Sequence, residues 1–125
     1  MDDNARAAEL MQKMLRKRLY ALISRPLVAP EKLKPLLATH LDYMIGLERR
    51  GLLFASGPLT DPGGAPSGHG LTIVRAKDAA EARAIAEAEP FFAHGLRAFE
   101  LKEWTVMEGT LGVRVNLSDQ SVEVT

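Results

Sequence analysis

The sequence predicts an α+β fold whose central elements run strand, helix, strand, strand, helix, strand. Four short apolar segments have the composition of strands, and two segments with three- and four-residue apolar spacing have that of helices. The strands are expected at 19–23, 52–55, 71–75 and 96–106, and the helices at 35–51 and 79–88. This order is the split βαβ arrangement of the ferredoxin-like fold.

The composition restricts the classes of protein that the chain can be. Of its 125 residues, 46% are hydrophobic and 26% are charged, as in an ordinary globular domain. Sixteen Lys and Arg balance sixteen Asp and Glu, so no net charge draws the protein toward nucleic acid or an anionic membrane. The absence of cysteine excludes disulfides, thiolate zinc sites and a cysteine nucleophile. We therefore expect neither nucleic acid nor a membrane as a partner.

The start of the chain predicts a cytoplasmic protein. The start of the chain is acidic, with Asp2 and Asp3, and the apolar residues that follow are interleaved with charges. A secretory signal has instead a basic start and an unbroken apolar run. No stretch approaches the ~20 apolar residues that a transmembrane helix needs.

Two extensions flank a core domain at 18–106. In the first, residues 1–17, apolar residues recur at helical spacing among charges, which predicts a helix over 3–17. In the second, residues 107–125, valines alternate with polar residues on both sides of Ser118–Gln120. Period-two alternation around a polar turn predicts a β-hairpin.

The first core helix is expected to begin at Pro35, after a turn over 30–34, because a proline inside a helix removes a backbone hydrogen bond. Gly51 is a suitable terminator. The apolar stripe of this helix consists of Leu33, Leu37, Leu41, Met44 and Leu47 or Ile45. His40 falls within that stripe, so its imidazole is expected on the inward side of the helix.

The second half of the core is punctuated by glycine and proline. Segment 56–70 contains five glycines and three prolines, so we expect a loop there, which is able to act as a lid over a pocket. The helix over 79–88 opens with a capping box and ends before Pro90. In the last strand Arg97 is expected to point outward and Phe99 inward. Trp104 then falls out of phase, which predicts a bulge or a strand end at residues 102–103.

An antiparallel sheet with both helices on one face leaves its other face bare. A bare apolar face is usually covered by a second subunit. The predicted fold therefore favours a homodimer or a higher homo-oligomer.

His40 and Glu89 are the candidate catalytic residues. A buried imidazole needs a polar partner, so His40 is either a structural residue bonded to a backbone carbonyl or a functional base. Glu89 ends a helix, where a carboxylate is disfavoured unless it has a cationic or donor partner. It is either a solvated carboxylate or the partner of a histidine, and a His–carboxylate pair suits general base catalysis.

The remaining histidines do not predict a metal site. His69 lies in the glycine-rich segment and His94 precedes Gly95, and the three histidines lack ligand spacing within one element. The glycine-rich segment also lacks the Gly-Lys-Ser/Thr ending of a phosphate-binding loop. We therefore expect no metal and no nucleotide cofactor.

Several short motifs occur in the order typical of one family. They are His40-Leu41-Asp42-Tyr43, Gly51-Leu52-Leu53, Gly57-Pro58, Glu89-Pro90-Phe91-Phe92, Gly95-Leu96 and Trp104. Over residues 18–106 the chain resembles the YCII-related (YciI-like) family. The resemblance implies a ferredoxin-like fold that dimerises into an α/β barrel, with a small-molecule pocket whose mouth holds Gly57-Pro58.

The resemblance also implies a catalytic dyad. The histidine of the family's His–Asp pair corresponds to His40, and its aspartate corresponds to Glu89, so this chain departs from the pattern by one methylene. One branch of the family resembles a dehydrochlorinase. The implied function is a cofactor-free lyase or isomerase that abstracts a proton, with His40 as base, Glu89 as its orienting carboxylate, and Ser56, Gly57, Pro58 and Phe91 at the substrate.

Two other interpretations stay open. The chain is alternatively a non-catalytic module for small-molecule binding or oligomeric assembly, with its terminal extensions as interaction surfaces. A metal-dependent or haem-associated oxygenase is a weaker alternative, because related barrels host such chemistry.

Overall fold

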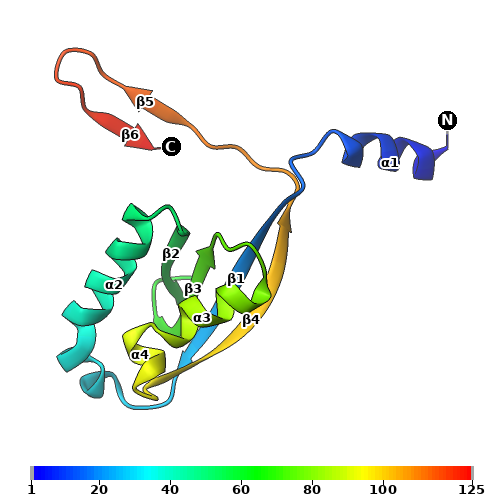
Figure 1. Ribbon diagram of the computed structural model, residues 1–125. Coiled ribbons are helices and arrows are strands. Elements are labelled where there is room, and N and C mark those ends of the chain that lie inside the picture. Colours follow the sequence, from blue (N-terminus) through cyan, green and yellow to red (C-terminus); the bar gives the residue numbers. More distant parts are fainter. Residues whose placement is uncertain (1, 125) are drawn as a thin grey trace. The chain divides into compact units, whose positions relative to one another are not determined.

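The computed structural model describes residues 2–124, and it has the predicted element order (Figure 1). The core elements are β1 (Lys17–Pro26), α2 (Leu37–Arg49), β2 (Leu53–Thr60), β3 (Pro66–Val74), α3 (Ala79–Glu87), α4 (Pro90–Ala93) and β4 (Arg97–Val106). The four strands form one sheet in the order β2-β3-β1-β4, in which β3 is antiparallel to both β1 and β2. This topology confirms the predicted α+β, ferredoxin-like class.

The chain divides into two compact units. The larger one is Arg18–Thr105, and the smaller one combines Met1–Lys17 with Val106–Thr125. Within residues 2–124, no helix is both long enough and apolar enough to cross a bilayer.

The smaller unit holds α1 (Asp3–Gln12) and a separate hairpin. Asp2 caps α1 by accepting a hydrogen bond from the Ala5 amide at 2.7 Å. The helix is shorter than the predicted 3–17, because the Leu15 amide donates instead to the Met107 carbonyl at 3.1 Å. Pairing with a distant segment of the chain thus ends the helical hydrogen-bond pattern.

The predicted C-terminal hairpin is formed by β5 (Val113–Val115) and β6 (Val122–Val124). Val113 pairs with Val124, and Val115 pairs with Val122. Directly opposite residues share one face of a ribbon, so all four valines lie on the same face, where they are 55% to 76% exposed. Arg114 and Glu123 form an ion pair, at 4.0 Å, on the other face.

The core of the larger unit lies between the sheet and α3. Tyr20 and Leu22 of β1 and Val74 of β3 pack against Ala82 and Ala86, and all five are almost completely buried. In Figure 1 the helices of this unit, α2, α3 and α4, lie on one side of the sheet. Because alanine has a single methyl group, α3 approaches the strands closely.

Helix α2 begins at Leu37 rather than at Pro35. Two short 3-10 turns precede it, Pro30–Lys32 and Lys34–Leu36, and Pro35 lies in the second turn. Pro35 is tolerated in the first turn of this helical segment, because the amide that proline lacks would have no partner there. Of the predicted apolar stripe, Met44 and Leu47 are buried and Leu33 is partly buried. Leu37, Leu41 and Ile45 are exposed instead.

The prediction of a loop over residues 56–70 is wrong. These residues belong to a hairpin of β2 and β3, closed by a short turn in which the Asp61 amide donates to the Ala65 carbonyl at 2.9 Å. Gly63 and Gly64, at φ 102° and 88°, supply the turn. The proline within β2, Pro58, is tolerated because β2 is an edge strand, and the pairing shifts register beside it. The segment is therefore part of the sheet and not a lid.

The inward and outward faces of β4 also differ from the prediction. Phe99 packs on the core as expected, and Leu101 does so too. Arg97 has the same parity and points to the same side, where it lines a cavity with Leu22. The strand continues to Val106 without ending at residues 102–103. Trp104 is an odd number of residues from Phe99 and Leu101, so its side chain lies on the opposite face of β4, where it is exposed.

Replacing Ala82 with leucine is expected to lower the free energy of unfolding by about 1–3 kcal/mol, because α3 leaves no room for the added carbons. Ala84→Leu is the matched control in the same helix, since residue 84 is exposed, and should change the free energy by less than about 0.5 kcal/mol. Urea denaturation followed by circular dichroism measures both. Equal effects would contradict the packing of α3.

Candidate active site

Two adjoining cavities lie between the sheet and the helices α2 and α4. The inner one has a volume of about 40 Å³, and the outer, open cleft about 710 Å³. Six residues line both: Ser24, His40, Met44, Thr72, Phe91 and Arg97. These shared residues mark the base of the cleft, and four of them are polar residues from four different elements.

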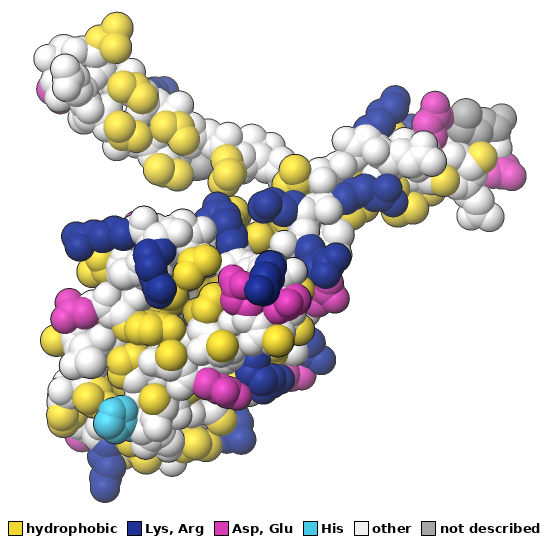
Figure 2. Space-filling model, in the orientation of Figure 1, with side chains coloured by type: hydrophobic (Ala, Val, Ile, Leu, Met, Phe, Trp, Pro, Cys, Tyr) yellow, Lys and Arg dark blue, Asp and Glu magenta, His cyan; other side chains and the backbone are white. Residues whose placement is uncertain are grey.

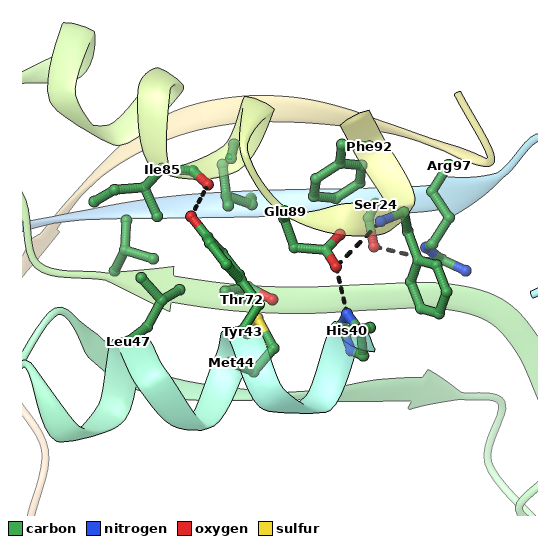
Figure 3. A pocket seen from close by; sticks show the side chains of 14 residues that line it. Ser24, His40, Tyr43, Met44, Leu47, Thr72, Ile85, Glu89, Phe92 and Arg97 are labelled. Atoms are coloured by element: carbon green, nitrogen blue, oxygen red, sulfur yellow. Dashed lines mark hydrogen bonds and ion pairs between the residues drawn. The ribbon is translucent and has the colours of Figure 1, made fainter. Parts of the chain in front are cut away.

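His40 and Glu89 are in contact. The His40 Nδ1 lies 2.5 Å from the Glu89 Oε1 (Figure 3). Glu89 is 4% exposed, so its carboxylate is almost fully removed from water, whereas the His40 side chain stays 24% exposed. The pair therefore has a buried acidic end and an accessible imidazole end.

Helix α4 explains why Glu89 is buried here. Pro90 does not simply end the alanine-rich helix, as expected, but is the first residue of α4. Glu89 is the N-cap of α4, and its Oε1 accepts a hydrogen bond from the Phe91 amide at 3.2 Å. Proline is favoured at the first helical position because no hydrogen bond is lost there. The same oxygen thus caps a helix and binds the histidine.

These contacts determine which imidazole nitrogen is available for chemistry. With Nδ1 engaged by a carboxylate, a neutral His40 carries its proton on Nδ1, which leaves the lone pair on Nε2. The Phe91 ring stacks on the imidazole with 4.4 Å between centroids and 17° between planes. The ring is therefore restricted in tilt as well as in tautomer, as a general base requires.

Tyr43 is a further polar residue at this site, which the sequence analysis named in a motif without assigning it a role. Its hydroxyl donates to the Ile85 carbonyl at 2.6 Å, which ties α2 to α3. Burial raises the pKa of Tyr43, and the nearby Glu89 charge raises it as well, while Arg50 opposes both. Tyr43 is thus a neutral hydrogen-bond donor that holds α2 in place.

The other predicted substrate-binding residues lie on two walls of the site. Ser56, Gly57 and Pro58 belong to β2 and line the outer cleft together with His40. The Ser56 hydroxyl lies 2.7 Å from the Thr72 hydroxyl of β3. Phe91 is buried beside His40.

Arg97 and Ser24 are polar residues of the site that the sequence reasoning missed. The Arg97 Nη2 donates to the Ser24 Oγ at 3.0 Å and to the Gly68 carbonyl at 2.7 Å. Burial lowers the pKa of Arg97, and the Glu89 charge partly opposes this. Strand periodicity could have indicated that Ser24 faces the site. Ser24 lies two residues after Leu22 and four after Tyr20, so all three side chains share one face of β1.

Among residues 2–124, no three His, Asp or Glu side chains cluster in a way that could hold a metal ion. His69 is exposed on β3 and lines the outer cleft, and His94 is exposed at the end of α4.

Residues 17–105 match the YCII-related domain family. The chain belongs to this family. The family resemblance drawn from the short motifs is therefore confirmed. Comparison with curated proteins gives no match.

A similar solved structure is the 5-chloro-2-hydroxyhydroquinone dehydrochlorinase from Burkholderia phenoliruptrix AC1100, in complex with 2,5-dihydroxybenzoquinone. The two chains are 22% identical with a TM-score of 0.56, over 69% of this chain and 93% of the other. At this level of identity the likeness shows the shared fold.

Removing the Glu89 carboxylate is expected to destabilise the protein. Glu89→Ala deletes the cap of α4 and the partner of His40, and should lower the free energy of unfolding by about 1–3 kcal/mol. Glu87→Ala, at an exposed position in the preceding helix, is the control and should cost less than about 0.5 kcal/mol. Urea denaturation compares them.

Histidine ¹⁵N NMR gives a second measurement on the Glu89 variant. In the wild type the neutral His40 ring should carry its proton on Nδ1, and Glu89→Ala should remove that preference. The exposed His69 and His94 supply internal reference signals. A proton on Nε2 in the wild type would contradict the assigned roles of the two nitrogens.

Proposed function

We propose that the chain is a small enzyme of lyase or isomerase type in which His40 removes a proton from carbon. The observation that supports this most is the contact between the His40 Nδ1 and the buried Glu89 carboxylate at the base of an open cleft. A general base held by a carboxylate, with its other nitrogen available, is suited to proton abstraction. The proposed reaction requires no cofactor.

In the proposed mechanism the Nε2 lone pair takes the proton of an acidic C–H bond. The electron pair of that bond forms a new double bond as a leaving group departs with its own electrons. In an isomerisation the proton returns instead to another carbon. Glu89 stabilises the imidazolium that forms, as the aspartate does in a Ser-His-Asp triad.

Glu89 is one methylene longer than the aspartate expected from the family pattern. Its Oε1 nevertheless reaches both the His40 ring and the Phe91 amide, at 2.5 and 3.2 Å. The longer side chain is therefore compatible with the orienting role, and the charge of the pair is unchanged.

The substrate is inferred to be a small polar or aromatic molecule. The cleft is lined by apolar side chains such as Leu41 and Met44 and by a few hydroxyls, including Ser56 and Thr72. We assign Ser56, Gly57 and Pro58 to substrate binding on the β2 wall, and Phe91 to positioning the imidazole. The dehydrochlorinase with the same fold binds a dihydroxybenzoquinone, which supports hydroxylated aromatic molecules as first candidates.

We also propose that the larger unit forms a homodimer. The sheet face away from the core includes Ile23 and Trp104, which are 40% and 42% exposed. Side chains of this size are usually covered by another subunit when they cluster on a sheet. Light scattering that gives a monomer mass at micromolar concentration would count against the dimer.

The valine face of the C-terminal hairpin favours a second candidate function, oligomeric assembly. A two-stranded ribbon is marginally stable by itself in water, and the four valines leave an apolar face exposed. A partner sheet or a second copy that covers this face would stabilise the ribbon.

Substituting His40 tests the enzymatic proposal. Small hydroxylated aromatic and lactone acids are screened by thermal shift, and a ligand should stabilise the wild type and His94→Ala more than it stabilises His40→Ala. With a ligand found in this way, hydrogen–deuterium exchange at its acidic carbon in D₂O, followed by NMR, should slow about 10²- to 10⁴-fold in His40→Ala. Full turnover by a folded His40→Ala protein would refute the proposal.

Truncation after Gly109 tests the assembly function. If the hairpin mediates assembly, the truncated protein should form a smaller oligomer in light scattering, with an unchanged circular dichroism signal from the core. Val113→Thr, which keeps the shape of the side chain and replaces one methyl group with a hydroxyl, should weaken assembly less than truncation. An unchanged mass after truncation would exclude the hairpin as the assembly element.

A further inference from the structure

The Arg97 guanidinium crosses part of the sheet to enter the cleft. Arg97 begins β4, an edge strand, and β1 separates β4 from β3. Its Nη2 donates to Ser24 on β1 and to the Gly68 carbonyl on β3. Figure 3 shows the side chain beside Ser24, on the side of the sheet from which His40 approaches. The guanidinium therefore forms part of the cleft floor.

Small residues make room for this crossing. A Cβ atom at Gly70 would lie 2.9 Å from the Ser24 Oγ and 3.8 Å from the Arg97 Nη2. Ser24 itself is short and buried. Glycine within a strand often marks such a close approach. The guanidinium is thus held in one place before any ligand arrives, which lowers the entropy cost of binding.

The charge of Arg97 has no acidic partner among residues 2–124. Both of its hydrogen bonds end on neutral oxygens, and no carboxylate oxygen of the described residues lies within 4.0 Å. The Glu89 carboxylate is already bound to His40 and the Phe91 amide. By contrast, exposed Arg18 pairs with Glu103 at 2.8 Å. A partly buried cation without a counter-ion is costly, and its Nε and Nη1 donors have no partner in this part of the chain.

We propose that Arg97 is a specificity-determining residue that binds a carboxylate of the ligand in the His40 cleft. A guanidinium matches the planar geometry and charge of a carboxylate better than any other side chain does. Arg97 and His40 line the same two cavities, so one small molecule can reach both. The inference deepens the proposed function: the substrate is an aromatic or lactone acid whose carboxylate lies at Arg97 and whose acidic C–H bond lies at His40.

The test compares matched probes of nearly the same shape, in which a neutral amide replaces the charged carboxylate. The probes are 2,5-dihydroxybenzoate with 2,5-dihydroxybenzamide, and 4-hydroxybenzoate with 4-hydroxybenzamide. Dissociation constants are measured by NMR titration at constant ionic strength. For at least one pair, the wild type should bind the carboxylate tenfold or more tightly than the amide. In Arg97→Gln the two affinities should agree within about twofold.

Control variants separate a local effect from loss of charge. Arg25→Gln removes the same charge from an exposed position on β1 and should keep the wild-type preference. Arg97→Lys keeps the charge without the planar fork, so it should keep a reduced preference. Arg97→Lys also tests the proposal if Arg97→Gln does not fold. A full wild-type preference for the carboxylate in Arg97→Lys would contradict recognition of the carboxylate by the planar guanidinium.

His40→Ala distinguishes this inference from the proposed reaction. If Arg97 binds the carboxylate, the preference should survive in His40→Ala even where proton exchange is lost. Loss of the preference in His40→Ala, with retention in Arg97→Gln, would assign the anion to His40 and overturn the inference. Failure of both carboxylates to bind the wild type at 10 mM would also overturn the inference about Arg97. The proposed role of His40 as a base would then still be tested by proton exchange on neutral substrates.

Discussion

The buried carboxylate of Glu89 is the constraint on which the rest of the site depends. A charge removed from water needs hydrogen-bond donors, and a carboxylate without them destabilises the fold strongly. One oxygen of Glu89 meets this need with the His40 ring and the Phe91 amide. The start of α4, the tilt of the imidazole and the packing of α2 near α4 are consequences of the same contact. Stability and the proposed chemistry are therefore coupled at this residue.

Short side chains determine what lies on the helix-covered face of the sheet. Ala82 and Ala86 let α3 approach one end of it. Ser24 and Gly70 leave space at the other end, which the Arg97 guanidinium partly fills. The face therefore changes from a packed apolar core into a polar cleft within two or three strand positions. This change, rather than any loop over the surface, separates the hydrophobic core from the proposed site.

Segment 56–70 shows where local reasoning from composition fails. Its glycines and prolines suggested a loop, but Gly63 and Gly64 form a short turn, while Gly68 and Gly70 lie within β3. Gly68 has a positive φ of 80°, whereas Gly70 is needed for its lack of a side chain beside Ser24. A glycine selected for backbone freedom and one selected for lack of a side chain look the same in a sequence. Arg97 was misplaced for a related reason: a charged residue was expected outward, although its parity matched that of Phe99. The cavity and its polar partners, which make the inward position possible, come from other strands.

The sequence by itself determined the order of the elements, the inward face of α2 that carries His40, and the family to which the chain belongs. These three features follow from the spacing of apolar residues and from the order of short motifs, both of which can be recognised in neighbouring residues of the chain. Only the tertiary structure decided that His40 meets Glu89, 49 residues away, and that Arg97 meets Ser24, 73 residues away. Such contacts depend on how closely α2 and α4 approach the sheet and on which neighbouring side chains are small. That information is distributed over several elements, so no single segment of the sequence contains it.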